Sequence, residues 1–207
     1  MGVFFGTDGL RGWVNKDLSA DIAYIVGNSL GSLRSGLKLL IGRDTRKSGA
    51  MLSLCVASGL MNAGADVTDV GICPTAGIAY LTMKLGFDYG VVISASHNPA
   101  EYNGIKIFNK DGKKVGDKLE TQIERNFLHE LAVDYTKVGT YTNSPRTVLT
   151  YVDFLESSIK TSLKGKTIVL DCSHGSSYKI APAVFRAKGA RIIATFCKPD
   201  GFNINDR

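Results

Sequence analysis

The 207-residue sequence is poor in the residues that hold small domains together covalently or through metal ions. It has three histidines, one tryptophan and four cysteines, and no two cysteines have the C-x-x-C spacing: Cys55, Cys73, Cys172 and Cys197. This scatter argues against a disulfide framework or a zinc site. We therefore expect free, mostly buried thiols in a reducing compartment, which favours the cytoplasm.

Long apolar runs are also missing. No stretch approaches the roughly 20 residues that a membrane-spanning helix needs, and the N-terminus has no basic segment followed by a long apolar stretch. We expect neither a membrane span nor a signal peptide. With 44% hydrophobic residues and only 5 prolines, the composition is that of a globular protein. The length permits one large domain or two small ones.

Positively charged residues outnumber negatively charged ones, but they are dispersed along the sequence. The sequence has 25 Lys and Arg against 19 Asp and Glu, a formal net charge of +6, and no basic run longer than Arg46-Lys47 or Lys113-Lys114. Dispersed cations of this kind do not form the basic stripe typical of nucleic-acid binding. We expect neither a nucleic-acid nor a membrane partner, whereas a phosphorylated small molecule needs only a few local charges.

Apolar runs of strand length alternate with segments of helical periodicity. The expected strands are residues 38–42, 67–70, 89–93, 104–108, 167–171 and 191–195. The expected helices are residues 18–34, 48–61, 74–85, 117–131, 147–162 and 177–188, with Ser19 as an N-cap and Asp117 with Glu120 as a capping box. This rhythm predicts an α/β fold with largely parallel pairing.

A polar stretch at residues 132–146, with Gly139, Asn143 and Pro145, predicts a domain boundary. The first domain would be residues 1–145. Residues 146–207 would then contain only one β-α-β unit, which leaves a sheet edge and a sheet face uncovered. We therefore expect residues 146–207 to be the incomplete start of a second domain.

The most informative segment for chemistry is residues 93–106, where an apolar strand ends in Ser94, Ser96, His97 and Asn98. Ligands of α/β proteins bind at the carboxyl ends of strands, and a serine there can act as a nucleophile or phosphate carrier if nearby donors stabilise charge. Lys106 alternates with apolar neighbours, so it should point to the opposite face of its strand. The alternative is a Ser/Asn-rich turn followed by a surface lysine.

Two further segments carry basic residues beside glycine. Residues 4–12 place three glycines around Asp8 and Arg11, which predicts a tight loop in which Arg11 binds phosphate through its planar guanidinium. The alternative is a turn with an Arg–Asp pair.

Residues 42–49 place Arg43 and Arg46 before a helix, where an anion site is plausible. The alternative there is a structural ion pair with Ser48 as the helix cap. His174, after the strand ending at Asp171, is more consistent with a turn than with catalysis, because no nucleophile lies at a readable spacing.

Four blocks, taken together, resemble the α-D-phosphohexomutase superfamily. They are residues 5–12 (Phe-Gly-Thr-Asp-Gly-Leu-Arg-Gly), 42–46 (Gly-Arg-Asp-Thr-Arg), 94–99 (Ser-Ala-Ser-His-Asn-Pro) and 103–106 (Asn-Gly-Ile-Lys). The resemblance implies a three-layer α/β/α domain with a mixed, largely parallel sheet, followed by the first part of a second similar α/β domain. It also implies that Ser96 is a phosphoserine that donates its phosphoryl group to a sugar phosphate.

The resemblance assigns roles to further residues. It implies that Lys106 is a general acid or base, that Arg11 neutralises phosphoryl oxygens, and that His97 and Asn98 act in the serine loop. Arg11, Asn98 and Lys106 would also contact the substrate. Mg²⁺ would bind the phosphate on Ser96, with its other ligands on a loop that would lie beyond Arg207.

The N-terminal block and the Asn-Ile-Asn sequence at residues 203–205 resemble those members that interconvert glucosamine 6-phosphate and glucosamine 1-phosphate. The resemblance thus implies a phosphorylated hexosamine as substrate and an isomerase activity that the 207-residue chain would lack when isolated. The alternatives are a mutase for phosphomannose or phosphoglucose, and a non-catalytic module that binds a phosphorylated ligand through Arg11, Arg43 and Arg46.

Overall fold

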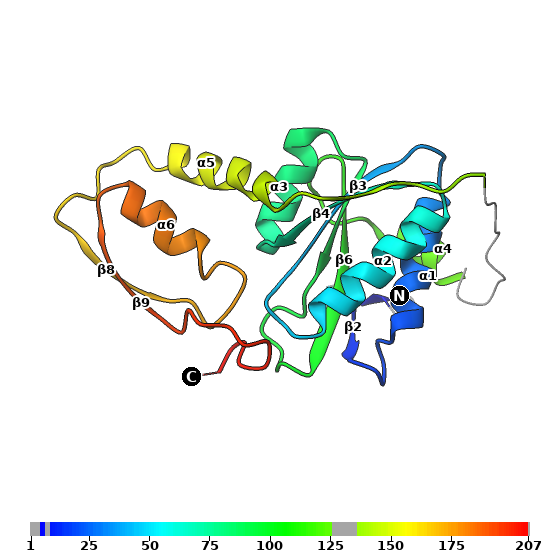
Figure 1. The fold of residues 1–207 in the computed structure, drawn as a ribbon, viewed down its shortest axis with the longest axis horizontal. Helices are drawn as coiled ribbons and strands as arrows, with labels where there is room; N and C mark the ends of the chain where they lie inside the picture. Colours follow the sequence, from blue (N-terminus) through cyan, green and yellow to red (C-terminus); the bar gives the residue numbers. More distant parts are fainter. Residues whose placement is uncertain (1–4, 7–8, 126–135, 207) are drawn as a thin grey trace.

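The computed structural model describes residues 5–6, 9–125 and 136–206, and its largest feature is a seven-stranded mixed sheet (Figure 1). The strand order is β1-β2-β6-β5-β3-β4-β7. The strands are β1 (Phe5–Gly6), β2 (Gly9–Trp13), β3 (Lys38–Arg43), β4 (Asp66–Ile72), β5 (Tyr89–Ile93), β6 (Tyr102–Asn109) and β7 (Tyr141–Asn143). The mixed α/β architecture is confirmed, and parallel and antiparallel pairings are equally represented among the described strands of this sheet.

Helices cover both faces of the sheet, as Figure 1 shows. On one face, α1 (Ala20–Gly31), α2 (Gly49–Asn62) and α4 (Asp117–Arg125) share a core with alternate strand residues such as Leu39 and Ile41. On the other face, α3 (Thr75–Leu85) packs over Leu40 and Val92. Because both faces are buried, β3 and β5 are continuous apolar runs without polar alternation.

A second, two-stranded parallel sheet consists of β8 (Thr167–Asp171) and β9 (Arg191–Thr195), with α6 (Ile180–Ala187) beside it. The helix α5 (Val148–Ser158) joins the two sheets, since Tyr151 shares a core with Ile78 of α3 and Ile180 of α6. The other side of β8 and β9 exposes Val169 and Ile193.

Several local predictions agree with the structure. The Ser19 hydroxyl accepts a hydrogen bond from the Ile22 backbone N–H at 3.2 Å, so Ser19 caps α1. The helix predicted at residues 74–85 is observed as α3 (Thr75–Leu85), and Gly86 follows it in the left-handed conformation, which a residue without a Cβ adopts easily.

Other local predictions are wrong. The capping box fails because Asp117 already lies inside α4, and Glu120 instead binds the Lys114 ammonium at 2.6 Å. The tight loop expected at residues 4–12 is instead a pair of strands, β1 and β2, of which β2 pairs antiparallel with β6. The loop was predicted from the three glycines, which have low strand propensity on their own. Thr7 and Asp8 of that motif, and residues 126–131 of the predicted helix, lie outside the described residues.

All four cysteines are free, as expected, and Cys73 and Cys172 are buried. Burial raises the pKa of the Cys73 thiol to about 12, so this thiol is an apolar packing group rather than a reactive one. No helix among the described residues is long and apolar enough to cross a membrane.

The helices α1 and α2 approach one another through glycine. A Cβ on Gly27 would lie 2.1 Å from the Val56 carbonyl oxygen, and one on Gly59 would lie 2.1 Å from the Tyr24 carbonyl oxygen. Each of these glycines therefore lets the opposite backbone come closer than any side chain would allow.

We predict that Gly59→Ala destabilises the protein by roughly 1–3 kcal/mol, the range of overpacking substitutions, because the helices must separate. The measurement is the free energy of unfolding in urea. Gly116→Ala is the matched control, since nothing lies within 4 Å of its Cβ position. Equal stability of the two variants would contradict the close-approach role of Gly59.

Candidate active site

The site is built where two neighbouring parallel strands end. Because β3 and β5 pair in parallel, the loop after Arg43 and the loop after Ile93 leave the sheet at the same edge. The Asp44 backbone N–H donates to the Ile93 carbonyl at 3.0 Å and fixes the two loops side by side. The second of these, residues 94–101, is called the serine loop below.

A buried ion pair lies beneath the serine loop. Asp44 and Arg46 are 4% and 3% exposed, and the Asp44 carboxylate accepts from Arg46 Nε at 3.0 Å and from the Arg46 backbone N–H at 3.0 Å. The Ser94 hydroxyl donates to the same carboxylate at 2.7 Å. The buried carboxylate thus accepts three hydrogen bonds, one of them from a cation, which offsets the cost of its burial.

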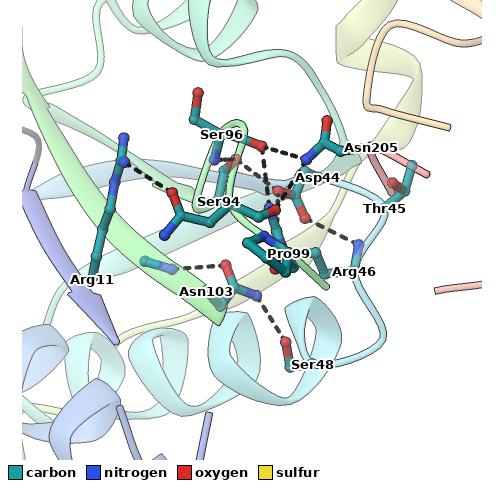
Figure 2. Close-up of polar contacts among 12 residues, drawn as sticks. Arg11, Asp44, Thr45, Arg46, Ser48, Ser94, Ser96, Pro99, Asn103 and Asn205 are labelled. Carbon is teal, nitrogen blue, oxygen red and sulfur yellow. Dashed lines mark hydrogen bonds and ion pairs between the residues drawn. The ribbon is translucent and has the colours of Figure 1, made fainter. Parts of the chain in front are cut away.

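The rest of the Arg46 guanidinium binds the backbone of the serine loop (Figure 2). Nη2 donates to the Ser96 carbonyl at 3.1 Å and to the Asn98 carbonyl at 2.8 Å, and Nη1 donates to the Pro99 carbonyl. An arginine whose donors are used in this way is not available for an outside anion. Of the two interpretations of residues 42–49, the structural ion pair is therefore correct for Arg46.

Arg43 is also engaged within the protein. Its Nη1 contacts both carboxylate oxygens of Asp69, at 3.1 and 3.2 Å, and Asp69 also accepts from the Tyr141 hydroxyl at 2.9 Å. Burial, followed by this hydrogen bond, raises the pKa of Tyr141. Because Arg43 and Arg46 both serve internal carboxylates, a binding module that relies on them for a phosphate is not supported.

Ser48 occupies the N-cap position of α2 but does not cap it. Its side chain makes no hydrogen bond to the helix backbone, and its oxygen instead accepts from Asn103 Nδ2 at 2.9 Å. The Asn103 oxygen accepts from the Gly104 N–H at 2.8 Å. Ser48 and Asn103 thus link α2 to the strand that follows the serine loop.

Ser96 stands in an unusual backbone conformation with its side chain exposed. Its φ angle is 58°, in the left-handed region that costs a residue with a Cβ roughly 1–2 kcal/mol. Its N–H donates to the Ser94 hydroxyl at 3.1 Å, and its carbonyl faces Arg46. Figure 2 shows the Ser96 hydroxyl pointing away from this network. The loop therefore presents one serine oxygen outward on a fixed backbone.

Arg11 and Lys106 lie on the same face of the sheet, next to the serine loop. Leu10 pairs with Ile105, and both belong to the core on the α1 and α2 side, so Arg11 and Lys106 point to the opposite side. The prediction for Lys106 is confirmed on this point. A Cβ on Gly104 would lie 3.0 Å from Arg11 Cγ, which shows that the arginine stem runs over the glycine.

Arg11 reaches the serine loop itself. Its Nη1 donates to the Asn98 side-chain oxygen at 3.4 Å. The Asn98 backbone N–H donates to the Ala95 carbonyl at 3.2 Å, which closes the turn that holds Ser96. His97 is exposed in this turn. The structure therefore brings Arg11, Ser96, His97 and Asn98 together at one end of the sheet, with Lys106 on the adjoining strand.

His174 belongs to a turn, as the sequence favoured. Its Nδ1 accepts from the Lys198 backbone N–H at 3.2 Å, and its carbonyl accepts from the Thr45 hydroxyl at 2.6 Å. Its ring contacts Phe196 edge-on. These contacts join the loop after β8 to the loop after β3.

Sequence reasoning missed Asn205 as part of this site, and it assigned no individual role to Ser94 or Asp44. Asn205 Nδ2 donates to the Ser96 and Asn98 carbonyls at 3.1 and 3.0 Å, from a segment more than 100 residues away. The Asn-Ile-Asn sequence at residues 203–205 contributes only to the family resemblance. Nothing in its spacing indicates a contact with the serine loop.

The described residues do not by themselves form a metal site. Among them, no group of three or more His, Cys, Asp or Glu side chains lies close enough to hold an ion. The buried carboxylates of Asp44 and Asp69 are engaged by Arg46 and Arg43, respectively.

The fold and the site define a class of protein that the comparisons identify. Residues 2–133 match the family model described as phosphoglucomutase/phosphomannomutase, alpha/beta/alpha domain I. The chain belongs to this family.

Its curated relatives include the phosphoglucosamine mutase of Clostridioides difficile, 48% identical over 99% of this chain and 48% of the relative. That of Alkaliphilus oremlandii is 43% identical over the same shares. The chain thus spans about half the length of the curated relatives it matches.

A solved structure gives the same assignment. A phosphoglucomutase/phosphomannomutase family protein from Burkholderia thailandensis superposes with a TM-score of 0.82 at 28% identity, over 96% of this chain and 44% of that one. The agreement extends over both sheets, since it includes nearly the whole chain.

We predict that Arg46→Ala destabilises the protein by about 3–5 kcal/mol, because it leaves the Asp44 carboxylate buried without its cation and removes one hydrogen bond from each of three carbonyls of the serine loop. Urea unfolding measures this change. Arg34→Ala is the matched control: Arg34 binds Asp88 at 2.7 Å with its side chain 61% exposed, and such surface pairs contribute roughly 0–1 kcal/mol. Similar losses in both variants would show that Arg46 is not a buried clamp.

Proposed function

We propose that this chain is part of a phosphoglucosamine mutase, which interconverts glucosamine 6-phosphate and glucosamine 1-phosphate through a phosphoserine and a sugar bisphosphate. The observation that carries the proposal is the exposed Ser96 hydroxyl on a backbone locked from below by Arg46, with Arg11 contacting the same loop. The identity of 43–48% to proteins named phosphoglucosamine mutase supports the choice of sugar.

In the proposed reaction, the 1-hydroxyl of glucosamine 6-phosphate attacks the phosphorus on Ser96. The new P–O bond to the sugar forms as the P–O bond to Ser96 breaks, which gives the 1,6-bisphosphate. The hydroxyl proton of the sugar passes to a base, and the serine oxygen regains a proton. After the bisphosphate reorients, Ser96 attacks the 6-phosphoryl group, which releases glucosamine 1-phosphate and restores the phosphoserine.

The residues around Ser96 suit these steps. Phosphoryl transfer depends mainly on positioning and on neutralising charge. Arg11 would neutralise phosphoryl oxygens, since its stem runs over Gly104 and its guanidinium reaches Asn98 of the serine loop. Lys106, on the same face of the sheet, would move the proton. Asn98 and the exposed His97 would bind the phosphoryl or sugar oxygens beside the loop.

We also propose a cofactor, a domain division and a location. When bound, Mg²⁺ would neutralise charge on the phosphoryl group, and the phosphate on Ser96 is the metal ligand that we assign to this chain.

We propose a first domain at residues 1–145 and a second that begins at residue 146; the two separate sheets support this division. The free cysteines fit a cytoplasmic protein.

We predict that wild-type protein treated with glucosamine 1,6-bisphosphate acquires one phosphoryl group, and that Ser96→Ala abolishes this incorporation because it removes the accepting oxygen. Intact-mass measurement with peptide mapping is the assay. Ser157→Ala, on the exposed end of α5, should be labelled like the wild type. A phosphoryl group on Ser96→Ala at the wild-type level would refute the assignment.

A coupled assay tests which sugar phosphate is the preferred substrate and whether the isolated 207 residues are inactive. The longest natural protein that carries this chain should convert glucosamine 6-phosphate with a higher kcat/KM than mannose 6-phosphate or glucose 6-phosphate. The isolated 207 residues should show no turnover. A preference for mannose or glucose phosphates would favour the other branch of the family, and full turnover by the isolated chain would contradict its expected inactivity.

A further inference from the structure

The serine loop is held from two sides by groups that share the same two acceptors. Arg46 Nη2 binds the Ser96 and Asn98 carbonyls from beneath the loop, and Asn205 Nδ2 binds the same two carbonyls from the C-terminal segment, residues 197–206. A carbonyl oxygen has two lone pairs and accepts two hydrogen bonds. Both carbonyls are therefore saturated only when Asn205 is in place.

The C-terminal segment is anchored at points away from the serine loop, directly to the loop after β3 and indirectly through residues 173–174. The Lys47 N–H donates to the Gly201 carbonyl at 2.8 Å, and Thr45 binds the His174 carbonyl. The Asn205 N–H in turn donates to the Ser173 carbonyl at 2.8 Å. These contacts aim the Asn205 side chain at the loop.

Backbone strain is concentrated at this contact. Six described residues other than glycine have a positive φ, and five of them lie in the serine loop or in the segments that meet it: Ser96, Ser173, His174, Phe196 and Asn205. Strained residues of this kind persist only where the surrounding contacts over-determine them. Asn is one of the few residue types that adopt a positive φ readily. An asparagine at position 205 therefore fits the backbone conformation there and also supplies the side-chain donor.

We propose that Asn205 is a positioning residue for the nucleophile: it completes, with Arg46, a two-sided clamp on the Ser96 and Asn98 carbonyls. The geometry of the serine loop then depends on the docking of residues 197–206, a part of the chain outside the sheet that carries the loop. The effect on phosphoryl transfer rests on the proposed function, whereas the effect on the loop does not.

Hydrogen exchange of the serine loop tests the clamp directly. The Asn98 and Tyr102 amides donate to carbonyls within the loop, at 3.2 Å each, so their exchange reports its opening. In Asn205→Asp, which keeps the size of the side chain but replaces the donor with a carboxylate oxygen, these amides should exchange at least about tenfold faster, since two hydrogen bonds are lost. The β5 amides should be unchanged.

Two further variants separate the causes. Asn205→Gly removes the side chain while glycine accepts the positive φ, so it should also speed loop exchange. Asn109→Asp adds the same charge at a turn where Asn109 accepts through its oxygen, so it should leave the loop unchanged. Unchanged loop exchange in Asn205→Asp, or an equal rise in Asn109→Asp, would overturn the clamp.

The same variants connect the clamp to catalysis. Phosphorylation of Ser96 by glucosamine 1,6-bisphosphate should slow at saturating donor by about tenfold or more in Asn205→Asp, while the half-saturating donor concentration stays the same. A faster-exchanging loop with an undiminished maximal rate would refute the positioning role. A wild-type protein that takes no phosphoryl group, but whose loop still opens in Asn205→Asp, would refute the proposed function and leave the clamp standing.

Discussion

The arrangement of the site depends on one buried ion pair, Asp44 with Arg46. Two charges taken out of water are costly unless they are paired and hydrogen-bonded, and here both are. The carboxylate accepts from the Arg46 side chain and backbone and from Ser94, and the guanidinium donates to three carbonyls of the serine loop. If either charge were missing, the other would be buried alone. The loop, the pair and the ends of β3 and β5 therefore form as one unit.

The order of strands explains why residues far apart in sequence meet here. The adjacency of β3 and β5 places the Asp44 loop beside the serine loop, and the antiparallel neighbours β6 and β2 carry Lys106 and Arg11 along the same edge. The register of β2 against β6 places Arg11 opposite Gly104, where its stem has room. The antiparallel strands β2 and β6 thus carry two cations on the side of the sheet next to the strand that leads into the serine loop.

The sequence predicted the elements of this fold better than their contacts. Apolar runs such as residues 38–42 and 89–93 are buried on both faces, so their strands follow from composition alone. The glycine-rich residues 9–13 read as a loop, because their strand is defined by pairing with β6 rather than by their own propensity. Of the site, the serine loop and the orientation of Lys106 followed from local pattern. The contacts of Arg46 and Asn205 with the serine loop did not, because a side chain that binds distant carbonyls produces no periodic pattern in the sequence.

The clamp also has an electrostatic consequence for the open side of the loop. A carbonyl oxygen carries partial negative charge and would repel a phosphoryl group. The Ser96 and Asn98 carbonyls face the Arg46 cation and the Asn205 amide instead, and a trans peptide turns the following N–H the opposite way. The His97 N–H therefore points away from Arg46. The Ser96 hydroxyl points away from Arg46 as well. Because Arg46 orients these carbonyls toward itself, the opposite side of the loop is more favourable to an anion. Arg46 has this effect without contacting the anion.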